Sequence, residues 1–285
     1  MKILITGGTS GIGLSFVKFF HLEHDITVVC RNQDKGEQLK GFYNIKVLYV
    51  DLSDYNQIME CFYKLDTDFD ILINNAGMSA TRKTVDFKNR KINKCLMVNL
   101  IAPYLFTEYM CKNKSLKKVI SVNSITHWVG ELPTIDDSVN NCYSNSKFGL
   151  MALHENWNKK YPETKFISIN PGYVDTGIWN PNASYENIHY YLRKVFSLKP
   201  DDSISVFRGA LNYEGDEPIY LSVNKNSELF LYLANKFSYK FMLANDFLGK
   251  LFLYSKVAEV NTKYSESIKE DNVKKVVDFC NNLIN

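Results

Sequence analysis

Short apolar runs alternate along the chain, up to about residue 180, with longer segments whose apolar residues recur every three or four positions. The short runs predict buried strands at residues 2–6, 26–30, 45–50, 70–74, 118–122 and 165–169. The longer segments predict helices over 11–20, 33–40, 55–64, 93–111 and 143–160. This alternation is typical of a parallel sheet covered on both faces, so the pattern predicts an α/β fold with a doubly wound sheet.

No internal repeat, low-complexity tract or Pro/Ser-rich linker marks a boundary between domains. We therefore expect one domain over residues 1–285, in which 178–260 forms a largely helical C-terminal elaboration. Within it, the apolar residues of 229–254 recur at spacings of three or four. This amphipathic segment is expected to pack on the body, cap a cleft, contact a second subunit or rest on a lipid surface.

Composition and charge exclude several classes of protein. Hydrophobic residues make up 45% and charged residues 23%, as in ordinary soluble domains, and the net charge of +3 is too small to indicate a nucleic-acid partner. Three lysines and an aspartate interrupt 229–254, so a membrane span is not expected. The six cysteines lack metal-ligand spacing, and the first residues look like a buried strand, so a secretory leader is not expected. Both observations favour a cytoplasmic protein without a metal site.

A glycine-rich turn joins the first predicted strand to the first predicted helix. Such a turn points backbone N–H groups and the positive end of the helix dipole at a cavity, which suits a pyrophosphate. Its spacing, Gly-x3-Gly-x-Gly, differs from the usual G-x-G-x-x-G fingerprint, and a merely tight turn is the alternative. The candidate phosphate-binding residues are Gly7, Thr9, Ser10, Gly11, Ile12 and Gly13.

Arg31 directly follows the second predicted strand. An acidic residue at this position would bind the ribose 2′-hydroxyl of NAD. A guanidinium can instead pair with the 2′-phosphate of NADP, although a solvated loop arginine is the alternative. The sequence therefore favours NADP(H) as cofactor and leaves NAD(H) open.

Four polar residues further along suggest acid–base chemistry: Asn99, Ser124, Tyr143 and Lys147. Positions 143 and 147 share one face of a helix, so the ammonium of Lys147 is expected to lower the pKa of the Tyr143 phenol. Tyr143 would then act as acid in carbonyl reduction or base in alcohol oxidation, while Ser124 polarises the substrate oxygen. Taken singly, each residue also has an ordinary structural interpretation, such as a half-buried helix tyrosine or a turn serine.

Together these motifs resemble the short-chain dehydrogenase/reductase family. The motifs are TGGTSGIG at 6–13, Asp51-Leu52, NNAG at 74–77, Asn99, Ser124, Tyr143-x3-Lys147 and Asn170-Pro171-Gly172. The resemblance implies a Rossmann-type sheet and an oxidoreductase that interconverts a carbonyl and an alcohol by hydride transfer with NADP(H) or NAD(H). A reductase of an activated C=C bond and a non-catalytic dinucleotide-binding sensor or scaffold are the alternatives.

The resemblance also implies a role for each matching position. Asn99 would hold a water in a proton relay, and Lys147 would also bind the nicotinamide ribose. Asp51 and Leu52 would lie by the adenine. The positions implied to line the rest of the cofactor cleft are Asn75, Ala76, Gly77, Pro171, Gly172, Val174 and Thr176. One departure is Asn123, where many members have a second serine.

Residues 30–37 and 124–127 are also similar to segments of the retinol dehydrogenase-like branch, which includes NADP-linked reductases of lipophilic aldehydes and ketones. This favours a partly apolar small-molecule substrate, framed by the loops after Ser124 and Gly172. The candidate pocket walls are His127, Trp128, Tyr173, Ile178 and Trp179. The tryptophans could equally pack a flap onto the core, and His127 is interpreted as a loop residue. The family resemblance further implies a homo-oligomer formed through helices 93–111 and 143–160.

Overall fold

The computed structural model describes residues 1–66, 68–112, 115–137, 141–172, 174–179, 197–215, 219–222, 258–259 and 266–284. The main sheet contains β1 (Lys2–Thr6), β2 (Asp25–Cys30), β3 (Lys46–Tyr49), β4 (Ile71–Asn74), β7 (Lys118–Val122), β8 (Lys165–Asn170), β9 (Ile219–Ser222) and β10 (Ala258–Glu259). Their order is β10-β9-β8-β7-β4-β1-β2-β3. All neighbours pair in parallel except β10, which runs antiparallel to β9.

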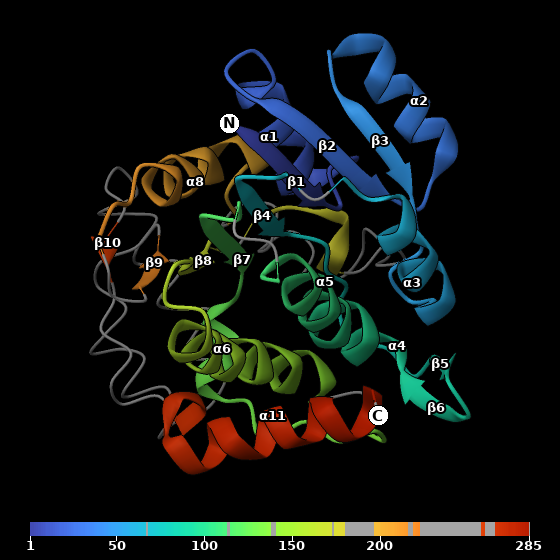
Figure 1. The fold of residues 1–285 in the computed structure, drawn as a ribbon, viewed down its shortest axis with the longest axis vertical. Coiled ribbons are helices and arrows are strands. Elements are labelled where there is room, and N and C mark those ends of the chain that lie inside the picture. Colours follow the sequence, from blue (N-terminus) through green and yellow to red (C-terminus); the bar gives the residue numbers. More distant parts are fainter. Residues whose placement is uncertain are drawn as a thin grey trace.

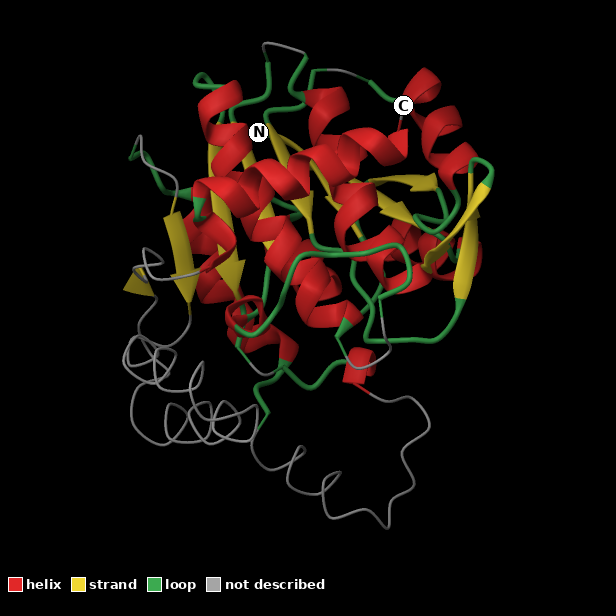
Figure 2. Ribbon diagram, turned by 90° about the horizontal axis from the view of Figure 1, so that it is seen from below, coloured by secondary structure: helices red, strands yellow, loops and turns green. Residues whose placement is uncertain are grey.

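Helices cover both faces of this sheet (Figures 1 and 2). They are α1 (Gly11–Phe20), α2 (Gln33–Phe42), α3 (Tyr55–Lys64), α4 (Lys94–Leu96), α5 (Ala102–Met110), α6 (Cys142–Lys160), α8 (Ile204–Leu211) and α11 (Glu270–Ile284). Successive residues of a strand point alternately to the two faces of the sheet, and so into two different core clusters. Ile3 and Ile5 pack in the cluster that contains Phe16 of α1, whereas Leu4 packs in the cluster that contains Phe106 of α5. This alternation is why the central strands are apolar at nearly every position.

The doubly wound sheet and its six predicted strands are confirmed. The predicted helix 93–111 consists of α4, a π-helical turn at Met97–Ile101 and α5. Three features were not predicted: the hairpin formed by β5 (Thr84–Phe87) and β6 (Arg90–Asn93), the edge strands β9 and β10, and α11. The hairpin lies apart from the main sheet (Figure 1).

The C-terminal helix α11 packs along α6 (Figure 1). Val276 and Cys280 of α11 are fully buried in the same cluster as Trp157 of α6, and the Tyr104 hydroxyl of α5 donates to Asn281 Oδ1 at 2.7 Å. α11 therefore covers part of the surface of α6 and is tied to α5 by one hydrogen bond. The homo-oligomer that the family resemblance implies, formed through helices 93–111 and 143–160, stays a prediction.

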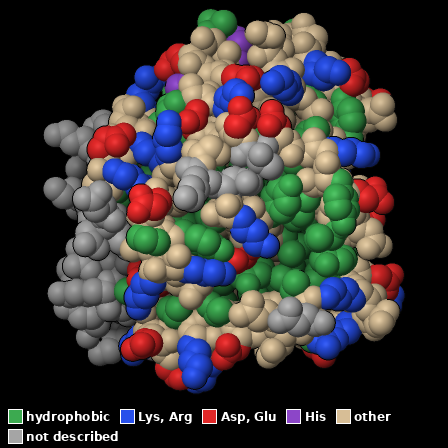
Figure 3. Space-filling view, in the orientation of Figure 1, with side chains coloured by type: hydrophobic (Ala, Val, Ile, Leu, Met, Phe, Trp, Pro, Cys, Tyr) green, Lys and Arg blue, Asp and Glu red, His purple; other side chains and the backbone are tan. Residues whose placement is uncertain are grey.

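The surface carries mixed charge on the face shown in Figure 3, where acidic and basic side chains are interspersed. This agrees with the small net charge of +3. Within the described ranges, no helix has both the length and the apolar character needed to cross a bilayer. The predicted amphipathic segment 229–254 lies outside the described residues.

Two histidines on the α6 side of the sheet are almost fully buried. His127 is 1% and His154 is 2% exposed. Burial lowers the pKa of His127 to about 4 and that of His154 to about 3, from an ordinary value of 6.5. The ring of His154 packs on Trp157 and Phe166, and its nitrogens have no hydrogen-bond partner among the described residues. Both imidazoles are therefore held in the neutral form.

The protein is expected to lose stability as the pH falls from about 6.5 toward 4. In that window His127 and His154 bind protons in the unfolded chain but stay neutral in the folded chain. This difference lowers the free energy of unfolding by up to about 1.4 kcal/mol per pH unit for each group. Urea unfolding at pH 7, 6 and 5 measures this slope. His154→Leu should flatten it, and an equal slope in wild type and variant would contradict the assignment.

Candidate active site

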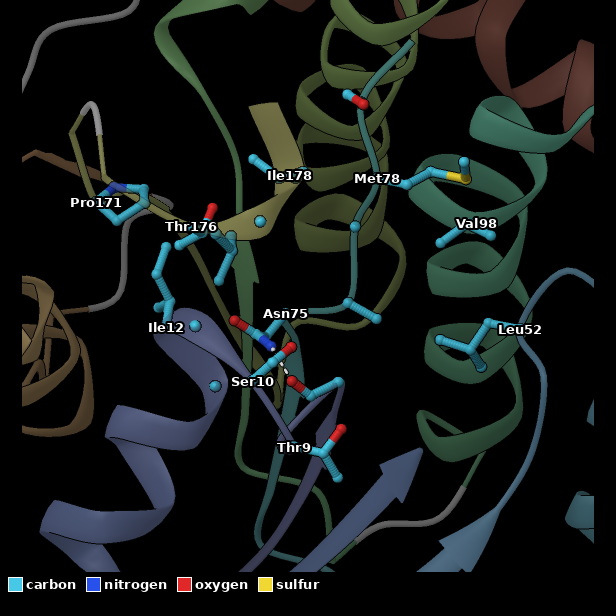
Figure 4. A pocket seen from close by; sticks show the side chains of 18 of the residues that line it. Thr9, Ser10, Ile12, Leu52, Asn75, Met78, Val98, Pro171, Thr176 and Ile178 are labelled. Atoms are coloured by element: carbon cyan, nitrogen blue, oxygen red, sulfur yellow. Dashed lines mark hydrogen bonds between the residues drawn. The ribbon is translucent and has the colours of Figure 1, made fainter. Parts of the chain in front are cut away.

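A cavity of about 590 Å³ opens at the carboxyl ends of the parallel strands. The chain leaves β3 and returns to the sheet beside β1 as β4, so the loops after β1 and β4 diverge and frame a crevice. Every predicted cofactor-site residue lines this cavity, and so do Ser124, Tyr143 and Lys147. In Figure 4, Ile12, Pro171, Thr176 and Ile178 lie on one side, facing Leu52, Met78 and Val98 on the other.

The glycine turn has little room for side chains. Gly7 and Gly11 adopt φ values of 74° and 52°, which favour glycine. A Cβ atom on Gly13 would lie 2.3 Å from the carbonyl oxygen of Gly7 and 2.5 Å from Nδ2 of Asn75. Ser10 precedes α1 in an extended conformation and makes no side-chain cap. The first N–H groups of α1 are thus left beside the cavity without intrahelical partners.

Asn75 ties the end of β4 to this turn. Its Nδ2 donates to the carbonyl oxygens of Thr6 at 2.8 Å and Gly7 at 3.1 Å. In return, the Thr6 hydroxyl accepts from the backbone N–H groups of Asn75 and Ala76 at 3.1 and 3.0 Å. The NNAG motif therefore fastens the two loops that frame the crevice.

Two cations and a carboxylate lie at the far end of the cavity. Arg31 and Lys35 both line it, and Asn32 begins α2 by accepting from the Lys35 N–H at 2.8 Å. Asp51 Oδ1 accepts from the Ser53 N–H and hydroxyl at 2.9 and 2.7 Å. Burial works against ionisation of Asp51, but these hydrogen bonds hold the pKa of its carboxyl below the ordinary value.

Tyr143 and Lys147 lie one helical turn apart on α6, as predicted. The Lys147 ammonium is 5.7 Å from the centre of the Tyr143 ring and donates to the Val122 carbonyl at 2.8 Å. Lys147 is only 4% exposed, and burial lowers its pKa to about 8. Ser124 lies two residues beyond the end of β7, and its hydroxyl accepts from the Thr126 N–H at 3.2 Å.

Asn99 lies behind the cavity lining, in the π-helical turn. Its side-chain amide makes two hydrogen bonds to the backbone of Met78. Oδ1 accepts from the Met78 N–H at 2.9 Å, and Nδ2 donates to the Met78 carbonyl at 3.0 Å. Nδ2 also donates to the Ser146 hydroxyl, which donates to the Tyr143 carbonyl at 2.6 Å. Asn99 thus links the loop after β4 to the turn of α6 that carries Tyr143.

The predicted pocket walls are only partly correct. Ile178 lines the cavity, but His127 and Trp128 do not: both are buried, His127 against Trp128 and Tyr220. The 3₁₀ turn Ile125–Trp128 after Ser124 turns them into the core. Tyr173 and the side chain of Trp179 lie outside the described residues.

Several lining residues were not predicted. They are Val29, Cys30, Lys35, Val50, Met78, Ser79, Val98, Val122, Asn123, Asn170 and Gly177. Cys30, Val122 and Asn170 are the last residues of their strands, and Val29 directly precedes Cys30 in β2. The rule that ligands bind beyond the carboxyl ends of parallel strands would have identified this group.

Comparison with known proteins places the chain in a family. A family model described as short chain dehydrogenase matches residues 1–187. The 3-oxoacyl-(acyl-carrier-protein) reductase FabG of Buchnera aphidicola is 29% identical over 206 residues, covering 67% of this chain and 80% of the relative. The short-chain dehydrogenase chyC of Penicillium rubens is 28% identical over 203 residues, covering 64% and 75%.

Solved structures share the fold. A 4-hydroxyisoleucine dehydrogenase complexed with NADH superimposes with a TM-score of 0.61 at 22% identity, covering 77% of this chain and 96% of that one. An NADPH-bound carbonyl reductase from chicken fatty liver gives a TM-score of 0.56 at 19% identity, covering 77% and 95%. With the family match over residues 1–187, the chain belongs to the short-chain dehydrogenase/reductase family of oxidoreductases.

Proposed function

We propose that this protein interconverts a carbonyl and an alcohol by hydride transfer with NADP(H). The observation that carries the proposal is that Tyr143, Lys147 and Ser124 line the same cavity as the glycine turn. A dinucleotide site and an acid–base group thus share one crevice. All six cysteines are thiols rather than disulfides, which supports the proposed cytoplasmic location.

The cavity residues suit a nicotinamide dinucleotide. The N-terminus of α1 and the side-chain-free surface of Gly7, Gly11 and Gly13 would hold the pyrophosphate. Asp51 and Leu52 would lie by the adenine, and Pro171 and Thr176 would face the nicotinamide end. Bound there, the nicotinamide ring would supply or accept the hydride.

The protein's own residues would carry out the proton transfer. Tyr143 would donate its phenolic proton to the carbonyl oxygen in reduction, or remove the hydroxyl proton in oxidation. In its protonated form, Lys147 would stabilise the ionised phenol, because its ammonium is 5.7 Å from the ring. Ser124 would donate a hydrogen bond to the same substrate oxygen. Asn99 would support proton transfer by fixing the turn of α6 that bears Tyr143.

The substrate is proposed to be a partly apolar aldehyde or ketone. Met78, Val98 and Ile178 supply apolar surface in the cavity that the reactive residues line, in agreement with the predicted lipophilic branch. Oxidation of NADPH by the purified protein with a panel of aldehydes and ketones tests the activity. Identification of an alcohol product separates it from reduction of a C=C bond, and no turnover with any carbonyl would favour a sensor or scaffold.

Preference for NADPH over NADH is expected to depend on Arg31 and Lys35, the two cations at the adenosine end. Arg31→Asp should weaken NADPH binding about 10- to 100-fold, because one charge-assisted hydrogen bond contributes about 1.5–3 kcal/mol. NADH binding should change far less. Fluorescence titration with both dinucleotides measures the difference. Arg82→Asp, an exposed site outside the cavity, is the control; equal losses for both cofactors in Arg31→Asp would dismiss phosphate pairing.

A further inference from the structure

Ser124 is held at both of its peptide groups by neighbouring side chains. Its N–H donates to Asn123 Oδ1 at 2.9 Å. Its carbonyl oxygen lies 2.8 Å from Nδ1 of His127 and also accepts from the His127 N–H at 3.1 Å. These contacts fix the backbone on either side of the serine side chain.

The imidazole of His127 is rigidly placed. It packs against Trp128 and Tyr220, with ring centres 5.3 and 5.0 Å away. A carbonyl oxygen can only accept a hydrogen bond, so Nδ1 must carry the proton and donate it to Ser124. Nε2 is then a buried acceptor, with no partner among the described residues. Among the described residues, the ring therefore hydrogen-bonds only to the Ser124 carbonyl.

Asn123 is anchored from the opposite side. Its backbone N–H donates to the Ile169 carbonyl of β8 at 2.8 Å, and its Nδ2 donates to the Ser168 hydroxyl at 3.2 Å. The side-chain amide can thus hold β8 with its nitrogen and Ser124 with its oxygen. A serine here, as in many members of the family, has a single hydroxyl and is too short to make both bonds.

We propose that Asn123 and His127 are positioning residues that aim the Ser124 hydroxyl at the substrate oxygen. Because the Ser124 hydroxyl accepts from the Thr126 N–H, its own hydrogen is left to donate into the cavity. Fixing both peptide groups keeps that donor in one direction, and a small misplacement of such a group slows catalysis severely. The inference rests on the proposed function, since it requires Ser124 to act on the substrate.

Two isosteric substitutions of His127 provide the first test. Asparagine places an amide N–H close to the position of Nδ1, whereas glutamine places it near Nε2. With NADPH and the best carbonyl of the panel, His127→Gln should lower kcat about 10- to 100-fold, and His127→Asn should stay within about threefold of wild type. KM for NADPH should be unchanged in both. Equal kcat in the two variants would overturn the proposal.

A double-mutant cycle separates positioning of Ser124 from general support of the fold. In a Ser124→Ala background, Asn123→Ser and His127→Gln should cause no further loss of kcat, because they act through the missing hydroxyl. If these substitutions lower kcat by the same factor in both backgrounds, the positioning proposal is overturned and the proposed function stays intact. Full activity of Ser124→Ala itself, or a wild type inactive on every carbonyl, would overturn both. Thermal unfolding of each variant confirms that folded proteins are compared.

Discussion

Tyr143→Phe is expected to reduce turnover of the best carbonyl by about 10³-fold, within the range that general acid–base catalysis contributes. The substitution removes only the hydroxyl, so the ring and its position over Lys147 are retained. The dissociation constant for NADPH should therefore stay within about twofold, because the cradle for the pyrophosphate is untouched. Steady-state kinetics and fluorescence titration measure the two quantities separately.

Tyr161→Phe is the matched control for loss of a tyrosine hydroxyl near α6. The Tyr161 hydroxyl donates to Glu108 at 2.8 Å, just beyond the far end of the helix. Its removal should cost about 1 kcal/mol of stability and leave kcat unchanged. Turnover by Tyr143→Phe equal to that of Tyr161→Phe would show that the Tyr143 phenol is not the acid.

The fold was predictable wherever burial leaves a simple pattern in the sequence. Strands such as β1 are buried on both faces, so Ile3, Leu4 and Ile5 form one apolar run. The hairpin of β5 and β6 has no such run: only Phe87, Ile92 and Asn93 are buried in it. The hairpin therefore depends on tertiary contacts, and no local pattern in the sequence could predict it.

The candidate site was predictable to the extent that residues follow a motif. Asn75 could be placed in the cofactor cleft from the resemblance, but its hydrogen bonds to Thr6 and Gly7 explain why an asparagine serves there. His127 was misplaced because only the 3₁₀ turn after Ser124 decides which way its side chain points. Lys35 was missed because it reaches the cavity from the first turn of α2, beyond the strand end where Arg31 lies.

Gly13→Ala is expected to abolish dinucleotide binding at ordinary concentrations and to destabilise the protein by about 1–3 kcal/mol, as overpacking does. The added Cβ would lie 2.3 Å from the Gly7 carbonyl oxygen and 2.5 Å from Asn75 Nδ2. Both are held by hydrogen bonds to each other, so neither can yield without moving the turn. Affinity for NADPH should fall at least about 100-fold, the scale of losing two charge-assisted hydrogen bonds. Fluorescence titration and urea unfolding measure the two effects.

Gly41→Ala separates this steric effect from the ordinary gain of replacing glycine in a helix. Gly41 is exposed in α2, and a Cβ there would meet nothing within 4 Å. That variant should gain about 1 kcal/mol of stability and bind NADPH like the wild type. If Gly13→Ala had the same stability and NADPH affinity as Gly41→Ala, a Cβ atom at position 13 would fit in the turn without a steric clash. The close approach of α1 to the β4 loop could then not be the feature that shapes the dinucleotide site.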